Sequence, residues 1–485
     1  MLYNSYIFIM AFLPIVLAGY YLLNHFKRYQ GALAWLCGAS LFFYGYFNWS
    51  YLPIIVVSIL GNFALSKILL KNLEHRGYFQ KILLTVGLAG NIGGLFYFKY
   101  YDFFIQNINK AFNTNFSLLH LLLPLGISFF TFQQLSYVID SYLGGVPRYS
   151  FLEYTVFVTF FPQLIAGPIV LHHEVIPQFA DLNNRKWNWE HFSEGLYAFF
   201  LGLGKKVLLA DTFAKAVEVG FSDVSALGTA NAIIVMLSYT FQIYFDFSGY
   251  CDMATGIGKF FNIDIPMNFN SPYRAVTITE FWNRWHMTLT RFFTTYIYIP
   301  LGGNRKGAWR TYFNVMVVFL VSGLWHGANW TFILWGLLHG IASVVTRMFK
   351  KQIERWHPAF SWLCTFLFIN ITWVIFRADS VNQVVAFMRQ LTNLNFTSIL
   401  SGIKEAFLLP EIKWMLDTFH KEKYSYMIWA IFLIFGLFGS LQMKNTNEKV
   451  GSFQPTVGRA AGLALLAIWG IISLSGVSVF LYWNF

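Results

Sequence analysis

A series of long apolar runs constrains this chain more than any other feature. Several of the runs approach the roughly 20 residues that a helix needs to cross about 30 Å of hydrocarbon. Hydrophobic residues make up 56% of the 485 residues and charged residues only 12%, whereas a soluble globular chain carries about 25% charge. This composition leaves too little polar surface for a water-soluble body. We therefore expect an integral membrane protein that crosses the bilayer many times.

The apolar segments are expected to be α-helices, because lipid does not tolerate unpaired backbone groups and the runs lack the alternation of a membrane barrel. The first run has no basic region before it and no cleavage site, so we expect it to be retained as a span. No repeat or linker divides the sequence, which predicts a single domain over residues 1–485. The expected segments are 3–23, 31–47, 51–70, 82–99, 118–138, 152–171, 194–210, 230–250, 312–326, 329–348, 360–376, 426–442 and 458–482.

The basic residues lie mainly in the loops between these segments. An excess of 34 Lys and Arg over 22 Asp and Glu could suggest nucleic acid, but the charges sit in short loops, which the positive-inside rule explains better. Lys27 and Arg28 follow the first run, and Lys67 to Lys81 follow the third. This places the N-terminus outside and both loops in the cytoplasm. We expect no nucleic-acid partner, and a basic cytoplasmic face would attract a phosphate-rich donor or an acidic carrier protein.

A semi-polar segment, residues 250–310, lacks a clean apolar run but is rich in aromatic and polar residues. Such a segment is tolerated in a membrane protein where it lines a cavity or lies at the interface, so we expect it to line the site. Thr277 to Glu280 has the pattern of a capping box, which predicts a helix that starts near Ile278. Continued at 100° per residue, this helix is amphipathic and is expected at the membrane surface. Its apolar face would hold Phe281, Trp285, Leu289 and Phe292.

Two histidines are candidates for chemistry, since ionisable groups within membrane spans are functional hypotheses by default. His326 lies in an apolar run between Gly323 and Gly327, where another chain or a ligand could approach the backbone closely. The alternative is that His326 only bonds a neighbouring helix. His339 lies about 220° further round a helix and is expected to face elsewhere. His286 lies in the semi-polar segment, where an interfacial histidine needs no special role.

Motifs of other enzyme classes do not occur in the sequence. There is no His-Glu-x-x-His, no Gly-x-x-x-x-Gly-Lys-Ser/Thr and no Gly-x-Ser-x-Gly, which argues against a metalloprotease, a P-loop nucleotide hydrolase and a serine hydrolase. His172 and His173 are adjacent and would project in different directions from a helix, so we expect no shared metal there.

Five motifs occur in order along the chain: PLGISFFTFQ at 124–133, FPQLIAGPI at 161–169, SYTFQIYFDFSGY at 238–250, FWNRWH at 281–286 and SGLWHG at 322–327. Together they closely resemble the membrane-bound O-acyltransferase family. The resemblance is to the bacterial branch that contains alginate O-acetyltransferases, peptidoglycan O-acetyltransferases and the D-alanyl transfer proteins of teichoic acid synthesis. It runs from about Met1 to His339 and is looser beyond.

The resemblance implies an all-α polytopic bundle, a ring of about 11–13 tilted helices around a central funnel, with interfacial amphipathic helices. It also implies that His326 is the essential catalytic residue and that His286 is its companion, which positions the acyl donor or polarises its carbonyl. Asn283 and Arg284 would line the site or hold donor phosphates. Asp246 would line or brace the site, and a buried structural carboxylate is the favoured role.

The C-terminal residues FLYWNF, at 480–485, resemble an aromatic terminal motif of this branch. Tyr482 would then be a relay that accepts the acyl group, although Trp483 stands where the motif has Phe. An aromatic anchor at the membrane interface is the equally weighted alternative for this end of the chain.

The function implied is transfer of an acetyl or similar small acyl group from a cytoplasmic thioester to hydroxyls of an extracytoplasmic polysaccharide or a partner protein. The donor would be acetyl-CoA or an acyl carrier protein, with no bound cofactor or metal. The expected partner is an extracytoplasmic SGNH-type acetyltransferase, and the expected location is the bacterial cytoplasmic (inner) membrane. The alternatives are a transporter or export channel, and a non-catalytic scaffold for an extracellular acetyltransferase.

Overall fold

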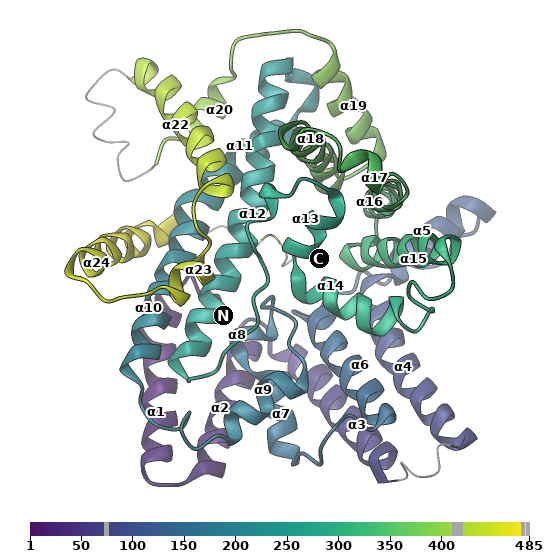
Figure 1. The fold of residues 1–485 in the computed structure, drawn as a ribbon, viewed down its shortest axis with the longest axis vertical. Coiled ribbons are helices and arrows are strands. Elements are labelled where there is room, and N and C mark those ends of the chain that lie inside the picture. Colours follow the sequence, from purple (N-terminus) through teal and green to yellow (C-terminus); the bar gives the residue numbers. More distant parts are fainter. Residues whose placement is uncertain (72–76, 410–420, 477–480, 482–485) are drawn as a thin grey trace. The chain divides into compact units, whose positions relative to one another are not determined.

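The computed structural model describes residues 1–71, 77–409, 421–476 and 481. Every regular element in these ranges is helical, and no strand occurs in them, which confirms the predicted all-α fold (Figure 1). The chain divides into two compact units, Met1–Phe199 with Met253–Pro266, and Phe200–Asp252 with Met267–Leu481. The single domain over residues 1–485 stays a prediction.

The first unit contains the N-terminal helices and most of α10. These elements are η1 (Phe8–Phe12), α1 (Leu13–His25), α2 (Tyr29–Gly45), η2 (Trp49–Tyr51), α3 (Leu52–Lys71), α4 (Tyr78–Lys99), α5 (Tyr101–Phe112), α6 (Ile127–Leu143), α7 (Phe151–Thr159), α8 (Phe161–Leu164), α9 (His172–Ala180) and α10 (Trp189–Gly204).

The second unit contains the rest. Its elements are η3 (Lys205–Ala210), α11 (Asp211–Ser222), η4 (Val224–Ala226), most of α12 (Thr229–Phe260), η5 (Pro272–Arg274), α13 (Ile278–Arg284), α14 (Met287–Phe293), η6 (Thr294–Tyr298), α15 (Ala308–His326), α16 (Trp330–Met348), α17 (Lys350–Ile353), α18 (Pro358–Arg377), α19 (Val381–Thr392), α20 (Ser401–Ala406), α22 (Lys421–Leu441), α23 (Thr446–Gly451), α24 (Val457–Ile472) and η7 (Ser473–Gly476).

Membrane-spanning character is clear from length and composition. In the most apolar window of α4 only 11% of the residues are buried within the protein, and so large an exposed apolar surface requires lipid to cover it. The chain is therefore a multi-pass membrane protein. Five described helical segments are long and apolar enough to span: Phe8–His25, Trp49–Lys71, Tyr78–Lys99, Trp330–Met348 and Pro358–Arg377.

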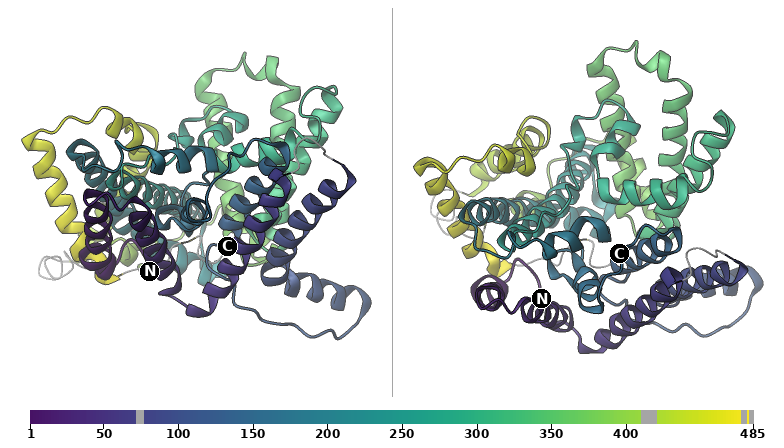
Figure 2. Two further views of the ribbon diagram at one scale, coloured as in Figure 1. Left: turned by 90° about the horizontal axis from the view of Figure 1, so that it is seen from below. Right: turned by 60° about the horizontal axis from the view of Figure 1, so that its bottom comes forward.

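The first unit is held by aromatic packing and by paired polar groups. Helices α1 and α2 pack side by side and are seen as the dark purple pair in Figure 2. The Tyr3 hydroxyl donates a hydrogen bond of 2.6 Å to the carbonyl oxygen of Phe161. Between α3 and α4, the side chains of Asn62 and Asn91 exchange hydrogen bonds of 3.1 and 2.6 Å. Such interhelical amide pairs satisfy polar groups that lipid cannot.

Helices α15 and α16 make the closest helix–helix contact of the second unit. A Cβ added at Gly323 would clash with the carbonyl oxygen of Phe332 and would lie 3.1 Å from the Cα of Gly336. The small residues therefore let the two backbones touch, as in other membrane helix pairs. The close approach that the sequence suggested beside Gly323 is thus taken up by α16.

The semi-polar segment starts its helix at the predicted residue but does not continue as one helix. Thr277 caps α13 by accepting a hydrogen bond from the Glu280 amide, so the predicted start at Ile278 is confirmed. The helix stops at Arg284, and His286 takes a left-handed conformation with φ 45° before α14 begins. The predicted apolar face, Phe281, Trp285, Leu289 and Phe292, is buried within this unit.

The α15–α16 contact predicts an asymmetry between two glycine substitutions. Gly323→Ala forces a methyl against a backbone oxygen and should destabilise the protein by about 1–3 kcal/mol. Gly90→Ala is the matched control, because a Cβ there meets nothing within 4 Å, and it should be neutral or stabilising by up to about 1 kcal/mol. Thermal unfolding of the detergent-solubilised variants measures both, and equal unfolding midpoints would contradict the contact.

Candidate active site

His286 is held in the interior of the second unit by a single asparagine side chain. The imidazole is fully buried, and its Nδ1 lies 3.0 Å from Oδ1 of Asn268. The same oxygen accepts hydrogen bonds from the backbone amide and the hydroxyl of Thr288, at 3.2 and 2.9 Å. The Asn268 carbonyl also accepts the Met287 amide. Asn268 therefore binds the first amides of α14, which explains why the expected helix is interrupted at His286.

These hydrogen bonds determine which nitrogen of His286 carries the proton. Because the Thr288 amide can only donate, the Asn268 atom that it contacts must be the oxygen. His286 must then donate through Nδ1–H, and its neutral ring has a lone pair at Nε2. Nε2 is buried and has no hydrogen-bond partner among the residues that the structure describes. A buried acceptor without a partner is unusual and is expected where a ligand or water binds.

His286 lies outside the five candidate spans, in a short turn between two helices. Burial lowers the pKa of its imidazole from about 6.5 to about 3. The ring is therefore neutral at physiological pH, and the lone pair on Nε2 is available to accept a proton.

His326 is the last residue of α15 and is also buried. Its ring packs against Trp325, Trp335 and Phe376, with centroids 4.9, 5.1 and 5.1 Å away. Trp325 also contacts His286, at 6.2 Å between centroids. The two histidines of the resemblance, 40 positions apart in sequence, thus lie against the same indole ring.

His339 shows what a structural histidine looks like in this unit. Its Nδ1 accepts a hydrogen bond of 3.2 Å from the indole N–H of Trp282, so its Nε2 carries the proton and donates to the Thr372 hydroxyl at 3.1 Å. Both nitrogens are used, unlike those of His286. The Trp335 ring contacts both imidazoles, so His339 belongs to the same aromatic cluster as His326. The expectation that His339 faces elsewhere stays a prediction.

Asp246, on α12, belongs to a buried ion-pair network. Its Oδ1 lies 2.6 Å from Nζ of Lys206, which also lies 2.7 Å from Asp211. The second oxygen of Asp246 accepts a hydrogen bond of 2.9 Å from the backbone amide of Leu481. Asp246 therefore anchors residue 481, and this agrees with the favoured role of a structural carboxylate. Tyr482, the tentative relay, lies outside the described residues.

Arg284 and Asn283 lie at the end of α13 and have different surroundings. The Arg284 guanidinium pairs with Glu280 at 2.9 Å and donates to the Asn270 carbonyl at 3.2 Å, so it is already engaged. Asn283 is exposed and lines a cavity of about 300 Å³ together with Ser322, one turn before His326. Neither His286 nor His326 lines that cavity.

Several polar groups of this unit were not predicted from the sequence. Asn268 is 18 positions from the histidine it holds, and no local pattern marks such a pair. Lys206 did carry a signal, because a lysine inside the predicted apolar segment 194–210 is a functional hypothesis. In the SYTFQIYFDFSGY motif, buried polar atoms without a hydrogen-bond partner in the described part of the chain include Ser238 Oγ, Tyr239 OH, Gln242 Oε1 and Ser248 Oγ.

Among the residues that the structure describes, no group of three or more His, Cys, Asp or Glu is arranged to hold a metal ion. The imidazoles of His286 and His326 both pack against the Trp325 indole, and a positioned histidine suits proton transfer to or from a hydroxyl.

Comparison with known proteins gives a consistent set of relatives. A sequence model of the membrane-bound O-acyltransferase family matches residues 146–382. The "Peptidoglycan O-acetyltransferase" of Helicobacter pylori is 41% identical, over 100% of this chain and 98% of the relative. The "Probable alginate O-acetylase" of Pseudomonas putida is 39% identical, over 79% of this chain and 78% of the relative. The "Teichoic acid D-alanyltransferase" of Streptococcus thermophilus is 30% identical, over 48% and 59% respectively.

The depressed pKa of His286 predicts how stability depends on pH. Between about pH 3 and 6.5 the unfolded imidazole binds a proton that the folded one does not, so stability falls as pH is lowered through this window and is complete above it. His286→Asn, which tolerates the left-handed backbone, should flatten the fall in unfolding midpoint between pH 7.5 and 4.5. The exposed His173→Asn is the control, and equal slopes in both variants would contradict the prediction.

Proposed function

The chain belongs to the membrane-bound O-acyltransferase family, and from this premise we propose that it transfers an acetyl or similar small acyl group to hydroxyls of an extracytoplasmic polysaccharide. Its membership confirms the resemblance of the five motifs, and with it the prediction of a membrane O-acyltransferase. The names of the relatives in Helicobacter pylori and Pseudomonas putida support acetyl as the group and a polysaccharide as the acceptor.

The observation that supports the catalytic assignment is that the imidazoles of His286 and His326 both pack against the ring of Trp325. Two buried imidazoles from separate sequence motifs converge on one ring. Packing alone does not require two histidines there. Acyl transfer to an alcohol does require a base, and a positioned histidine contributes about 10² to 10⁴ in rate.

In the proposed reaction His326 removes the proton of the acceptor hydroxyl as its oxygen attacks the thioester carbonyl. The carbon–oxygen bond forms, the carbon–sulfur bond breaks, and the proton passes from the imidazolium to the departing thiolate. The products are an ester and a free thiol. The indole and phenyl rings around His326 exclude water, which would otherwise compete with the acceptor hydroxyl.

The tautomer of His286 changes the role that we assign to it. Polarising a carbonyl requires an N–H, but Nδ1–H already bonds Asn268 and the neutral Nε2 has only a lone pair. We therefore assign His286 to accepting a hydrogen bond from the substrate. Asn268 is the positioning residue that fixes this tautomer, much as second-shell groups fix metal-bound histidines.

The proposed reaction also needs an acyl donor and an acceptor partner. A cytoplasmic thioester, acetyl-CoA or an acyl carrier protein, would supply the acyl group, and the cavity beside Asn283 is the candidate donor site. Arg284 is held by Glu280, so phosphate binding would fall to other basic residues. Tyr482 would relay the acyl group to an extracytoplasmic SGNH-type acetyltransferase or directly to the polymer. The membrane would be the bacterial cytoplasmic membrane.

His326→Ala should reduce ester formation from labelled acetyl-CoA in reconstituted vesicles by at least about 10²-fold, while the protein still inserts and unfolds at a similar temperature. The exposed His120→Ala is the matched control and should keep full activity. Ester formation that survives in His326→Ala would remove the catalytic assignment. Flux of substrate without any ester would favour a transporter, and full activity of a partner enzyme with both histidines removed would favour a scaffold.

For the relay, the C-terminal peptide of protein incubated with labelled donor should carry the acyl group on Tyr482. Tyr482→Phe retains the aromatic ring and removes only the hydroxyl, so it should abolish both the labelled peptide and transfer to the polymer. Mass spectrometry measures the first and the vesicle assay the second. A fully active Tyr482→Phe protein would leave the residue as an aromatic anchor.

A further inference from the structure

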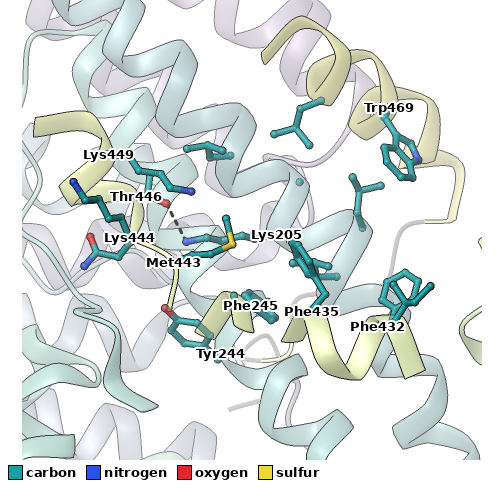
Figure 3. Close-up of a pocket in the computed structure, with 18 of the residues that line it drawn as sticks. Lys205, Tyr244, Phe245, Phe432, Phe435, Met443, Lys444, Thr446, Lys449 and Trp469 are labelled. Carbon is teal, nitrogen blue, oxygen red and sulfur yellow. Dashed lines mark hydrogen bonds between the residues drawn. The ribbon is translucent and has the colours of Figure 1, made fainter. Parts of the chain in front are cut away.

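A second cavity, in the second unit, has an apolar end and a basic end. Its volume is about 460 Å³, within the range of about 300–1,000 Å³ typical of ligand sites. Figure 3 shows Lys444 and Lys449 at one side of the cavity and the aromatic side chains of Phe432, Phe435 and Trp469 at the other. The apolar lining includes Leu201, Leu208, Phe432, Phe435, Leu466 and Trp469.

The basic end is formed by three lysines of unequal availability. Lys205 is committed, because its Nζ lies 2.6 Å from Asp252 and donates to the Thr446 hydroxyl at 2.9 Å. Lys444 is exposed and Lys449 is half-buried, and neither ammonium has a hydrogen bond or ion pair in the described part of the chain. Burial, together with the charge of Lys205, lowers the pKa of Lys449. A bound anion would therefore stabilise both free ammonium groups.

The position of this end is fixed by the fold. Arg274 donates hydrogen bonds of 2.7 Å to the carbonyl oxygens of Leu441 and Met443, which anchors the end of α22 directly before Lys444. The lysines lie between two short apolar helices, Met427–Leu441 and Val457–Ile472. A basic connection between apolar helices is expected at the cytoplasmic face, where lipid headgroups carry negative charge.

The apolar end is open. Phe435 and Trp469 each expose 43% of their surface, and in a membrane such a slot is filled by an acyl chain. A soluble anion would leave it uncovered, and a neutral lipid would leave Lys444 and Lys449 without a partner. We propose that the cavity binds an anionic phospholipid, with an acyl chain along Phe435 and Trp469 and the phosphate between Lys444 and Lys449. The proposal is independent of the acyl-transfer chemistry.

Native mass spectrometry of the full-length protein, extracted in detergent and titrated with phosphatidylglycerol or phosphatidylcholine, tests the site. Wild type should retain phosphatidylglycerol in preference to phosphatidylcholine. Lys444→Gln with Lys449→Gln should reduce that preference by about fivefold for each lysine removed. The matched control is Lys350→Gln with Lys351→Gln, a basic pair outside the cavity, and it should behave as wild type.

Gly439→Phe tests the apolar end separately. Gly439 lines the slot, and a Cβ there has only ordinary contacts, the nearest at 3.6 Å to Phe245, so a phenyl ring would fill the space. Gly439→Phe should retain less lipid although both lysines are still present. If Gly439→Phe fails to fold, the double lysine variant tests the proposal. Equal retention of both lipids by wild type, or a preference that survives the lysine substitutions, would overturn the proposal. Displacement of the lipid by coenzyme A alone would reassign the lysines to a soluble phosphate ligand.

Discussion

The structure depends on how polar groups are satisfied inside an apolar body, where each unpaired group costs several kcal/mol. Asn268 is the clearest case, because one carboxamide oxygen accepts the Thr288 amide, the Thr288 hydroxyl and the His286 imidazole. That one side chain binds the start of α14 and fixes the proton of His286. The site therefore follows from the folding constraint and is not added to a finished scaffold.

Two buried histidines differ in how their ring nitrogens are used. His339 uses both ring nitrogens, one as acceptor from Trp282 and one as donor to Thr372. His286 uses one and leaves the other buried without a partner in the described residues. In the buried network of Lys206, Asp211 and Asp246, the single ammonium group lies within 2.7 Å of both carboxylates. A buried lone pair without a hydrogen-bond partner is expected where a ligand binds.

Helix positions were predictable because they depend on local composition. Each predicted apolar segment contains a helix, and the capping pattern at Thr277 located the start of α13. Amphipathic helices such as α11 and α19 were missed, since a search for apolar runs does not detect an alternating face. The break at His286 was missed for a different reason, because it is imposed by Asn268 from a distant part of the sequence.

The histidines themselves were found from the residues and the motifs, but their relation to one another was not. Nothing in the sequence indicates that Trp325 contacts both imidazoles, because ring contacts between segments depend on how α13, α14 and α15 pack. The proton position on His286 is equally hidden, since it depends on which atom of Asn268 faces the ring. Tertiary hydrogen bonds of this kind are what a sequence pattern leaves open.

The most direct measurement of the central claim is ¹⁵N NMR of histidine-labelled protein in bilayers, with and without a non-transferable acyl donor analogue. His286, assigned by its loss in His286→Asn, should be neutral at pH 5 with its proton on Nδ1. Addition of the analogue and an acceptor alcohol should shift the Nε2 signal of His286 and the ring signals of His326. A His286 ring that protonates near pH 6.5, or imidazole signals that ignore both substrates, would contradict it.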